Sequence, residues 1–208
     1  MVRGLFNLAE GNEILNLLLE KYNDYMRLKN CTVEYSLSNG QVIMAKYKEE
    51  NFPHLIGLHK LQDIQLIQFW TDRSNRTVKL KDVIRAIRNE RLTDSDVKQS
   101  CFYSLISDRY DQLSYDNLTT LNYTDAIINF NPSIMNSMLS GDYILFEEKP
   151  LGEYNHMSIA LNQQTGDRYI ESFFHHTNGS YIYNQTIVGV DSFVIKDSNG
   201  NVIVQDKF

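Results

Sequence analysis

The apolar residues of this 208-residue chain change their spacing near residue 141, and this change constrains the fold more than any other feature. Before it, apolar side chains recur at helical spacing, as in the segments 5–28 and 79–91. After it, turn sequences separate four runs rich in β-branched and aromatic residues: Tyr143–Glu148, His156–Leu161, Arg168–Phe174 and Ile187–Ile195. Helices followed by strands are typical of an α+β fold. We therefore predict N-terminal helices packed on a C-terminal four-stranded antiparallel meander.

A β-hairpin is predicted inside the helical half. Thr32–Leu37 and Val42–Lys48 alternate apolar and polar residues on either side of Ser38-Asn39-Gly40. Asn-Gly favours the positive φ angles of a type I′ turn, which matches the twist of paired strands. The hairpin is thus expected to pack against the meander.

The chain around the hairpin is predicted to be helical. An opening helix runs from about Leu5 to Leu28, and a short helix begins with Asn51 as its cap and continues through Leu61. Another helix begins near Thr93 and passes through Cys101 to about residue 106. Residues 107–140 are predicted to be helical and irregular.

Length and composition favour one domain over residues 1–208. Its expected parts are a helix in 1–30, the hairpin with further helices in 31–140, and the sheet in 141–208. No apolar run is long enough for a membrane span, and Glu10 and Glu13 lie where a signal peptide would be apolar. We therefore predict no membrane partner and a cytoplasmic location.

The formal charge of −6 is unevenly distributed. Residues 73–91 carry 7 basic and 2 acidic side chains, whereas residues 92–208 carry 6 and 15. Lys81, Arg85 and Arg88 share one face of the predicted helix 79–91. Such a face is usually solvated surface, but a basic island also binds polyanions. Arg85 and Arg88 are therefore candidate substrate-binding residues.

The histidines do not have the spacing of metal ligands. His54 and His59 are five residues apart rather than four, and the adjacent His175 and His176 would point to opposite faces of a strand. We predict no metal site and no cofactor, and we expect His175 and His176 to form a solvated strand end.

Histidine, lysine and serine can nevertheless cleave RNA without a metal. The reaction needs a base for the 2′-OH proton, an acid for the leaving oxygen, and donors or cations at the phosphorus. One cluster of such groups contains His54, His59 and Lys60, and a second, on two predicted strands, contains His156 and Ser172. His156 and Ser172 would face each other in one strand register, which the sequence does not determine. A capping role for His54 and a packing role for His156 remain alternatives.

Six segments together resemble one known family. They are Asn51–Leu61, Arg109 within Asp-Arg-Tyr, Ile128–Pro132, Asp142–Phe146, His156–Ile159 and Tyr169–Phe174. In order and spacing they are similar to the phage- and prophage-encoded nuclease-like proteins of the group that joins barnase, EndoU, colicin-type and RelE-type RNases. The resemblance covers most of residues 30–195.

The resemblance implies RNA cleavage by transesterification in a phage or toxin context, inside a bacterial host cell. It implies that one of His54 and His156 is the base and the other the acid, and that Ser172 is a donor. Lys60 and Arg109 would then stabilise the phosphate, with His59 as a further substrate-binding residue. RNA is the expected partner, together with an antitoxin or host protein.

Two other functions stay open. The charge of −9 in residues 92–208 favours a catalytically silent scaffold that presents acidic surface to a nucleic-acid-binding host or defence protein. Alternatively, Cys101 followed by His156 and Glu171 has the order of nucleophile, base and orienting residue in papain-like thiol hydrolases.

Overall fold

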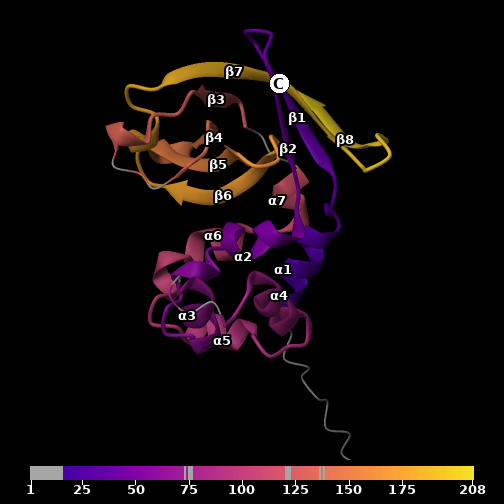
Figure 1. Ribbon diagram of the computed structural model, residues 1–208. Helices are drawn as coiled ribbons and strands as arrows, with labels where there is room; N and C mark the ends of the chain where they lie inside the picture. The colour runs from indigo at the N-terminus through magenta and orange to yellow at the C-terminus, as the bar shows by residue number, and fades with distance from the viewer. Residues whose placement is uncertain (1–15, 73, 75–76, 120–122, 136, 138) are drawn as a thin grey trace, which may run out of the picture.

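The computed structural model describes residues 16–72, 74, 77–119, 123–135, 137 and 139–208. Its α-helices are α1 (Leu17–Met26), α2 (Phe52–Leu55), α3 (Gln65–Thr71), α4 (Leu80–Arg88), α5 (Asp94–Gln99), α6 (Ser107–Gln112) and α7 (Tyr115–Thr119). Its strands are β1 (Thr32–Leu37), β2 (Val42–Lys46), β3 (Asp125–Ile128), β4 (Tyr143–Lys149), β5 (Glu153–Leu161), β6 (Arg168–His176), β7 (Thr186–Lys196) and β8 (Val202–Lys207). Figure 1 shows the strands above the helices, and β6 contacts α2 and α6. The predicted α+β class is confirmed.

The strands form one sheet in the order β1-β2-β6-β5-β4-β3-β7-β8, and β1 also pairs with β7. These pairings close a ring of seven strands. The predicted meander is correct for β4, β5 and β6, but β7 pairs with β3 and β1 instead of β6. The nine residues between His176 and Thr186 explain the difference, because a connection of this length does not form a tight hairpin.

The predicted hairpin forms between β1 and β2, with Thr32 opposite Lys46 and Ser36 opposite Val42. Its turn is not type I′, because only Gly40 has a positive φ, of 83°. The amide of Gly40 donates to the carbonyl of Leu37, as in a type I turn followed by a glycine bulge.

Several predicted boundaries differ. The opening helix was expected from Leu5, but residues before 16 lie outside the described part of the chain, where α1 begins at Leu17. Helix α5 begins after Thr93, as predicted, yet it ends at Gln99 because Ser100 turns away and donates to Asp63. Cys101 therefore lies beyond the helix. Strand β3 lies in the segment expected to be helical, since its four residues are too few to show alternation.

A continuous apolar cluster joins the helices to the sheet. Helix α4 was predicted correctly and buries Val83, Ile84, Ala86 and Ile87 against it. Tyr22 of α1 meets the ring of Phe52 at 5.3 Å between centroids. The two halves thus share one core, and no helix among the described residues has both the length and the apolar character needed to cross a membrane.

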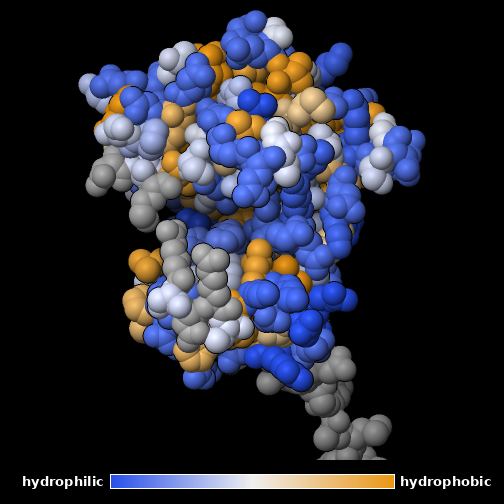
Figure 2. Space-filling view, viewed as in Figure 1, coloured by the Kyte–Doolittle hydropathy of each residue, from blue (hydrophilic) through white to orange (hydrophobic). Residues whose placement is uncertain are grey.

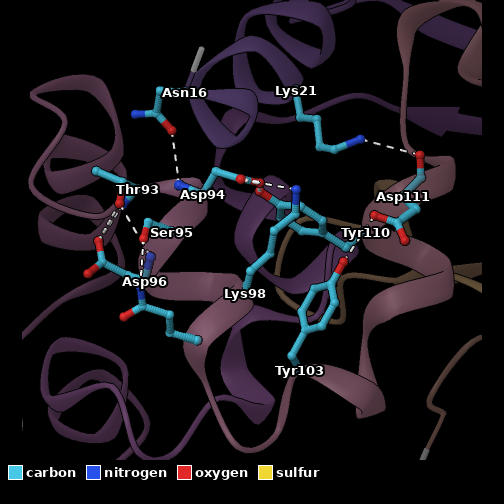
Figure 3. Close-up of polar contacts among 11 residues, drawn as sticks. Asn16, Lys21, Thr93, Asp94, Ser95, Asp96, Lys98, Tyr103, Tyr110 and Asp111 are labelled. Atoms are coloured by element: carbon cyan, nitrogen blue, oxygen red, sulfur yellow. Dashed lines mark hydrogen bonds and ion pairs between the residues drawn. The ribbon is translucent and has the colours of Figure 1, made fainter. Parts of the chain in front are cut away.

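A polar network holds α6 against α1 and α5 (Figure 3). The Tyr110 hydroxyl donates to Asp94 at 2.8 Å, and Lys98 forms an ion pair with the same carboxylate at 3.1 Å. Lys21 donates to the backbone carbonyls of Asp111 and Leu113. Residues on the C-terminal side of Arg109 are thereby tied to two other helices, which fixes the position of α6.

Candidate active site

A cleft of about 580 Å³ lies between β6 and the helical half. His54, His59, Lys60 and Arg109 line it on the helical side, and Glu171 and Ser172 line it on the sheet side. In Figure 2 the surface is hollowed, and largely hydrophilic, between the strand half and the helical half. Five of the residues predicted from the sequence therefore meet in one place: His54, His59, Lys60, Arg109 and Ser172.

The cleft exists because the edge of β6 is only partly covered. Within the described residues, β2 pairs with β6 at one position, between Lys46 and Tyr169. Beyond it, the side-chain amide of Asn51 donates to the carbonyl of Ile170 at 3.1 Å. Asn51 was predicted to cap a helix, but it makes no capping bond and instead docks the start of α2 on β6.

Gly57 brings the helical groups together. Gly57 has a φ of 83°, which stops the helical backbone of α2 from continuing, so that Leu58–Lys60 form a separate 3₁₀ turn. A Cβ atom built on Gly57 would lie 2.8 Å from Cδ of Arg109. The motif around His54 therefore needs glycine twice, for its backbone angle and for the approach of α6.

Positive charge is concentrated in the cleft. Burial, together with the charges of His54, Arg109 and Lys60, lowers the pKa of His59 to about 4. The pKa of Lys60 is also lowered, first by burial and then by Arg109. With neutral histidines, the lining carries Lys60 and Arg109 against Glu171 alone, a balance of +1 in a chain whose net charge is −6. Cations that repel one another in a cleft form a binding site for an anion.

Glu171 is held firmly in place. Its carboxylate accepts hydrogen bonds from the amide and hydroxyl of Ser140 and, at 2.8 Å, from the hydroxyl of the fully buried Ser158. A Cβ on Gly141 would lie 2.3 Å from Oγ of Ser158, so glycine makes room for this bond. The charge of Glu171 acts on His54, where it offsets part of the lowering of the pKa by burial.

Ser172 and Arg109 connect the two walls. A guanidinium nitrogen of Arg109 lies 3.4 Å from Oγ of Ser172, which is 7% exposed. Burial lowers the pKa of Arg109. A donor from the sheet and a cation from α6 therefore reach the same point in the cleft.

His156 does not reach the cleft. Its side chain is fully buried and stacks on Phe174 at 4.8 Å between ring centroids. Neither ring nitrogen has a hydrogen-bond partner among the described residues. Burial lowers its pKa to about 3. In the register of β5 and β6, Ser172 lies opposite Ser158 and His156 lies opposite Phe174, so the imagined pairing of His156 with Ser172 does not occur.

The remaining predicted residues lie elsewhere. Arg85 and Arg88 line a different hollow, on the exposed face of α4. Cys101 is exposed, its backbone amide donates to Asp63, and the hydrogen bond between its thiol and Asp63 raises the thiol pKa. His156, by contrast, is fully buried and packed among aromatic rings, away from the surface on which Cys101 lies. The described structure thus does not assemble the thiol and imidazole of a papain-like enzyme.

Two features of the cleft were not predicted from the sequence. His175 and His176 line it, although a solvated strand end was expected. Glu171 was weighed as an orienting residue for His156 in the papain-like hypothesis, not as a reactive group facing His54. Alternation along β6 hid this, because residues from both faces reach a cleft at the edge of the strand. No group of three or more potential metal ligands gathers within the described residues.

Known proteins resemble this chain at the level of a family model. Comparison with curated proteins and with solved structures found no match. A family model described as "phage-Barnase-EndoU-ColicinE5/D-RelE like nuclease4" matches residues 17–205, which includes every side chain of the cleft. The chain therefore belongs to this family of nuclease-like proteins.

Proposed function

We propose that the protein is a metal-independent endoribonuclease that cleaves RNA in the cleft between β6 and α6. Membership in a nuclease-like family supports nucleic acid as the substrate. The observation that carries the proposal is the gathering of His54, Lys60 and Arg109 opposite Glu171 and Ser172. These side chains supply a base, an acid and phosphate ligands within one cleft.

Glu171 is the base in this proposal. It takes the proton of the ribose 2′-OH, and the 2′-oxygen attacks the adjacent phosphorus. His54 is the acid, and it donates a proton to the 5′-oxygen as the bond between phosphorus and that oxygen breaks. The products are a 2′,3′-cyclic phosphate and a free 5′-OH. His54 suits the second role because it lines the cleft, whereas His156 is enclosed.

Lys60 and Arg109 stabilise the negative charge on the phosphorane, and Ser172 donates a hydrogen bond to it. Bound phosphate would also relieve the repulsion that lowers the pKa of His59 and Lys60. Two fixed cations in a partly buried cleft perform the electrostatic task that a metal ion performs in other nucleases.

The test is incubation of the purified protein with total RNA in the presence of EDTA. Wild type should cleave and leave 2′,3′-cyclic phosphate ends, detected by resistance to a phosphatase that removes only monoesters. Glu171→Gln and His54→Ala should each lower kcat/KM by about 10²–10⁴-fold. Glu148→Gln, a change of an exposed carboxylate on β4 outside the cleft, is the matched control. Full activity in both cleft variants, or activity that EDTA abolishes, would refute the proposal.

A further inference from the structure

Two hollows continue the cleft across the helical half. The first, of about 600 Å³, shares Asn51, His54 and Tyr169 with the cleft. The second, of about 500 Å³, shares Glu50 and Leu80 with the first and ends on the exposed face of α4. Adjoining hollows with common walls form one groove. It runs from the proposed catalytic groups to Arg88.

Charge along this groove favours an anionic chain. Its two hollows are lined by Lys48, Lys81, Arg85 and Arg88 against the two carboxylates of Glu49 and Glu50. Glu49 is already engaged, because it accepts hydrogen bonds from the Tyr22 hydroxyl and the Lys29 ammonium, each at 2.6 Å. The balance of +2 stands out in a chain whose total charge is −6.

The cations of α4 are available to a ligand. Lys81, Arg85 and Arg88 are exposed, and Lys81 and Arg88 form no ion pair or hydrogen bond within the described part of the chain. Arg85 has a neighbour in Asp82, at 3.5 Å. The positions i, i+4 and i+7 set the three cations along about 10 Å of one helix face. This linear arrangement suits successive phosphates of a nucleic-acid strand rather than a single phosphate.

The junction with the cleft offers a surface for a base. Tyr169 and His54 line both the cleft and the adjoining hollow, and the ring of His54 packs on that of Trp70 at 4.8 Å between centroids. Alternation of aromatic rings with cations is typical of proteins that bind single-stranded nucleic acid through stacking and backbone charge.

We infer that the groove along α4 binds the single strand of RNA that extends from the scissile phosphate, so that the enzyme prefers substrates several nucleotides long. Lys81, Arg85 and Arg88 contact successive phosphates, and a base stacks near Tyr169. This inference rests on the proposed ribonuclease function, since it gives that site its substrate class. Glu50, which lines both hollows, weakens the binding of the strand.

The test measures binding separately from cleavage. A fluorescent single-stranded 2′-O-methyl octanucleotide has no free 2′-OH and stays intact, and its affinity is measured by anisotropy across a series of salt concentrations. For a single strand, each phosphate contact contributes about 0.7 to the slope of log K against log salt concentration. One contact therefore raises the affinity about fivefold at 0.1 M salt relative to 1 M salt. Arg85→Ala/Arg88→Ala should thus lower the slope by about 1.4 and the affinity by about 25-fold. A dinucleotide probe should lose less affinity.

The matched control is Arg91→Ala/Lys207→Ala, which removes the same charge from exposed residues outside the groove. It should leave the slope nearly unchanged, and Glu50→Gln should strengthen binding of the octanucleotide. Equal losses in the groove and control variants would overturn the inference, as would tighter binding of an RNA duplex or equal competition by an acidic peptide. Cleavage of total RNA by wild type tests the proposed function independently, so that either idea can fail alone.

Discussion

Gly57→Ala is the substitution that best tests how the cleft is built. Alanine at a φ of 83° costs about 1–2 kcal/mol of folding free energy. Its Cβ would also lie 2.7 Å from Cγ2 of Ile106 and 2.8 Å from Cδ of Arg109. Relieving such overpacking costs about 1–3 kcal/mol more. Because Ile106 is buried and Arg109 ends in a flexible chain, the displacement falls mainly on Arg109.

Gly40→Ala is the matched control, since Gly40 has the same φ of 83° and nothing within 4 Å of the added carbon. Urea unfolding should show a loss of about 1–2 kcal/mol for Gly40→Ala and about 2–5 kcal/mol for Gly57→Ala. Under folding conditions, only Gly57→Ala should also lose RNA cleavage. Equal destabilisation of both variants with cleavage intact would show that the contact between Gly57 and Arg109 does not organise the cleft.

Further predictions concern the histidines and α6. His156→Phe should keep RNA cleavage and should remove a destabilisation by acid. The pKa of His156 in the folded protein, about 3, lies below the usual 6.5, so the unfolded chain binds more protons between these pH values. The free energy of unfolding therefore falls as pH falls through this range, by at most about 1.4 kcal/mol per pH unit. Unfolding curves at pH 4 and pH 7 measure this, and an unchanged difference would contradict it. If His54 is the acid, kcat/KM should decline as pH rises through a pKa below 6.5, a limb that a pH profile with His54→Ala would lack. Tyr110→Phe should cost about 1 kcal/mol and reduce cleavage through the placement of Arg109, and unaltered kcat/KM would argue against that coupling.

The sequence predicted the elements of the fold better than their connections. The spacing of apolar residues was sufficient for α4, and strand alternation was sufficient for β4, β5 and β6. The partners of β7 were not predictable, because pairing depends on where a nine-residue connection leads and not on the residues of the strand itself. Strand β3 carries too short a pattern to distinguish it from irregular chain.

The candidate site was predicted in part for a similar physical reason. His54 and Lys60 were found because polar groups near Pro53 and Gly57 are visible in any sequence, and Arg109 was found through the family resemblance. His156 was included because a histidine in a strand has no feature that reveals its burial, which depends here on Phe174 and on rings from neighbouring segments. Glu171 gained its importance only from the open edge of β6.

The pairing of β1 with β7 has a consequence for the order in which the protein is made. Lys196 donates to Glu34 at 2.6 Å across 162 positions of the chain. The hairpin of β1 and β2, which is synthesised early, therefore cannot complete its pairing until β7 is synthesised. Contacts over such separations slow folding. Until β7 emerges from the ribosome the ring stays open, and the sheet that carries Glu171 and Ser172 is incomplete.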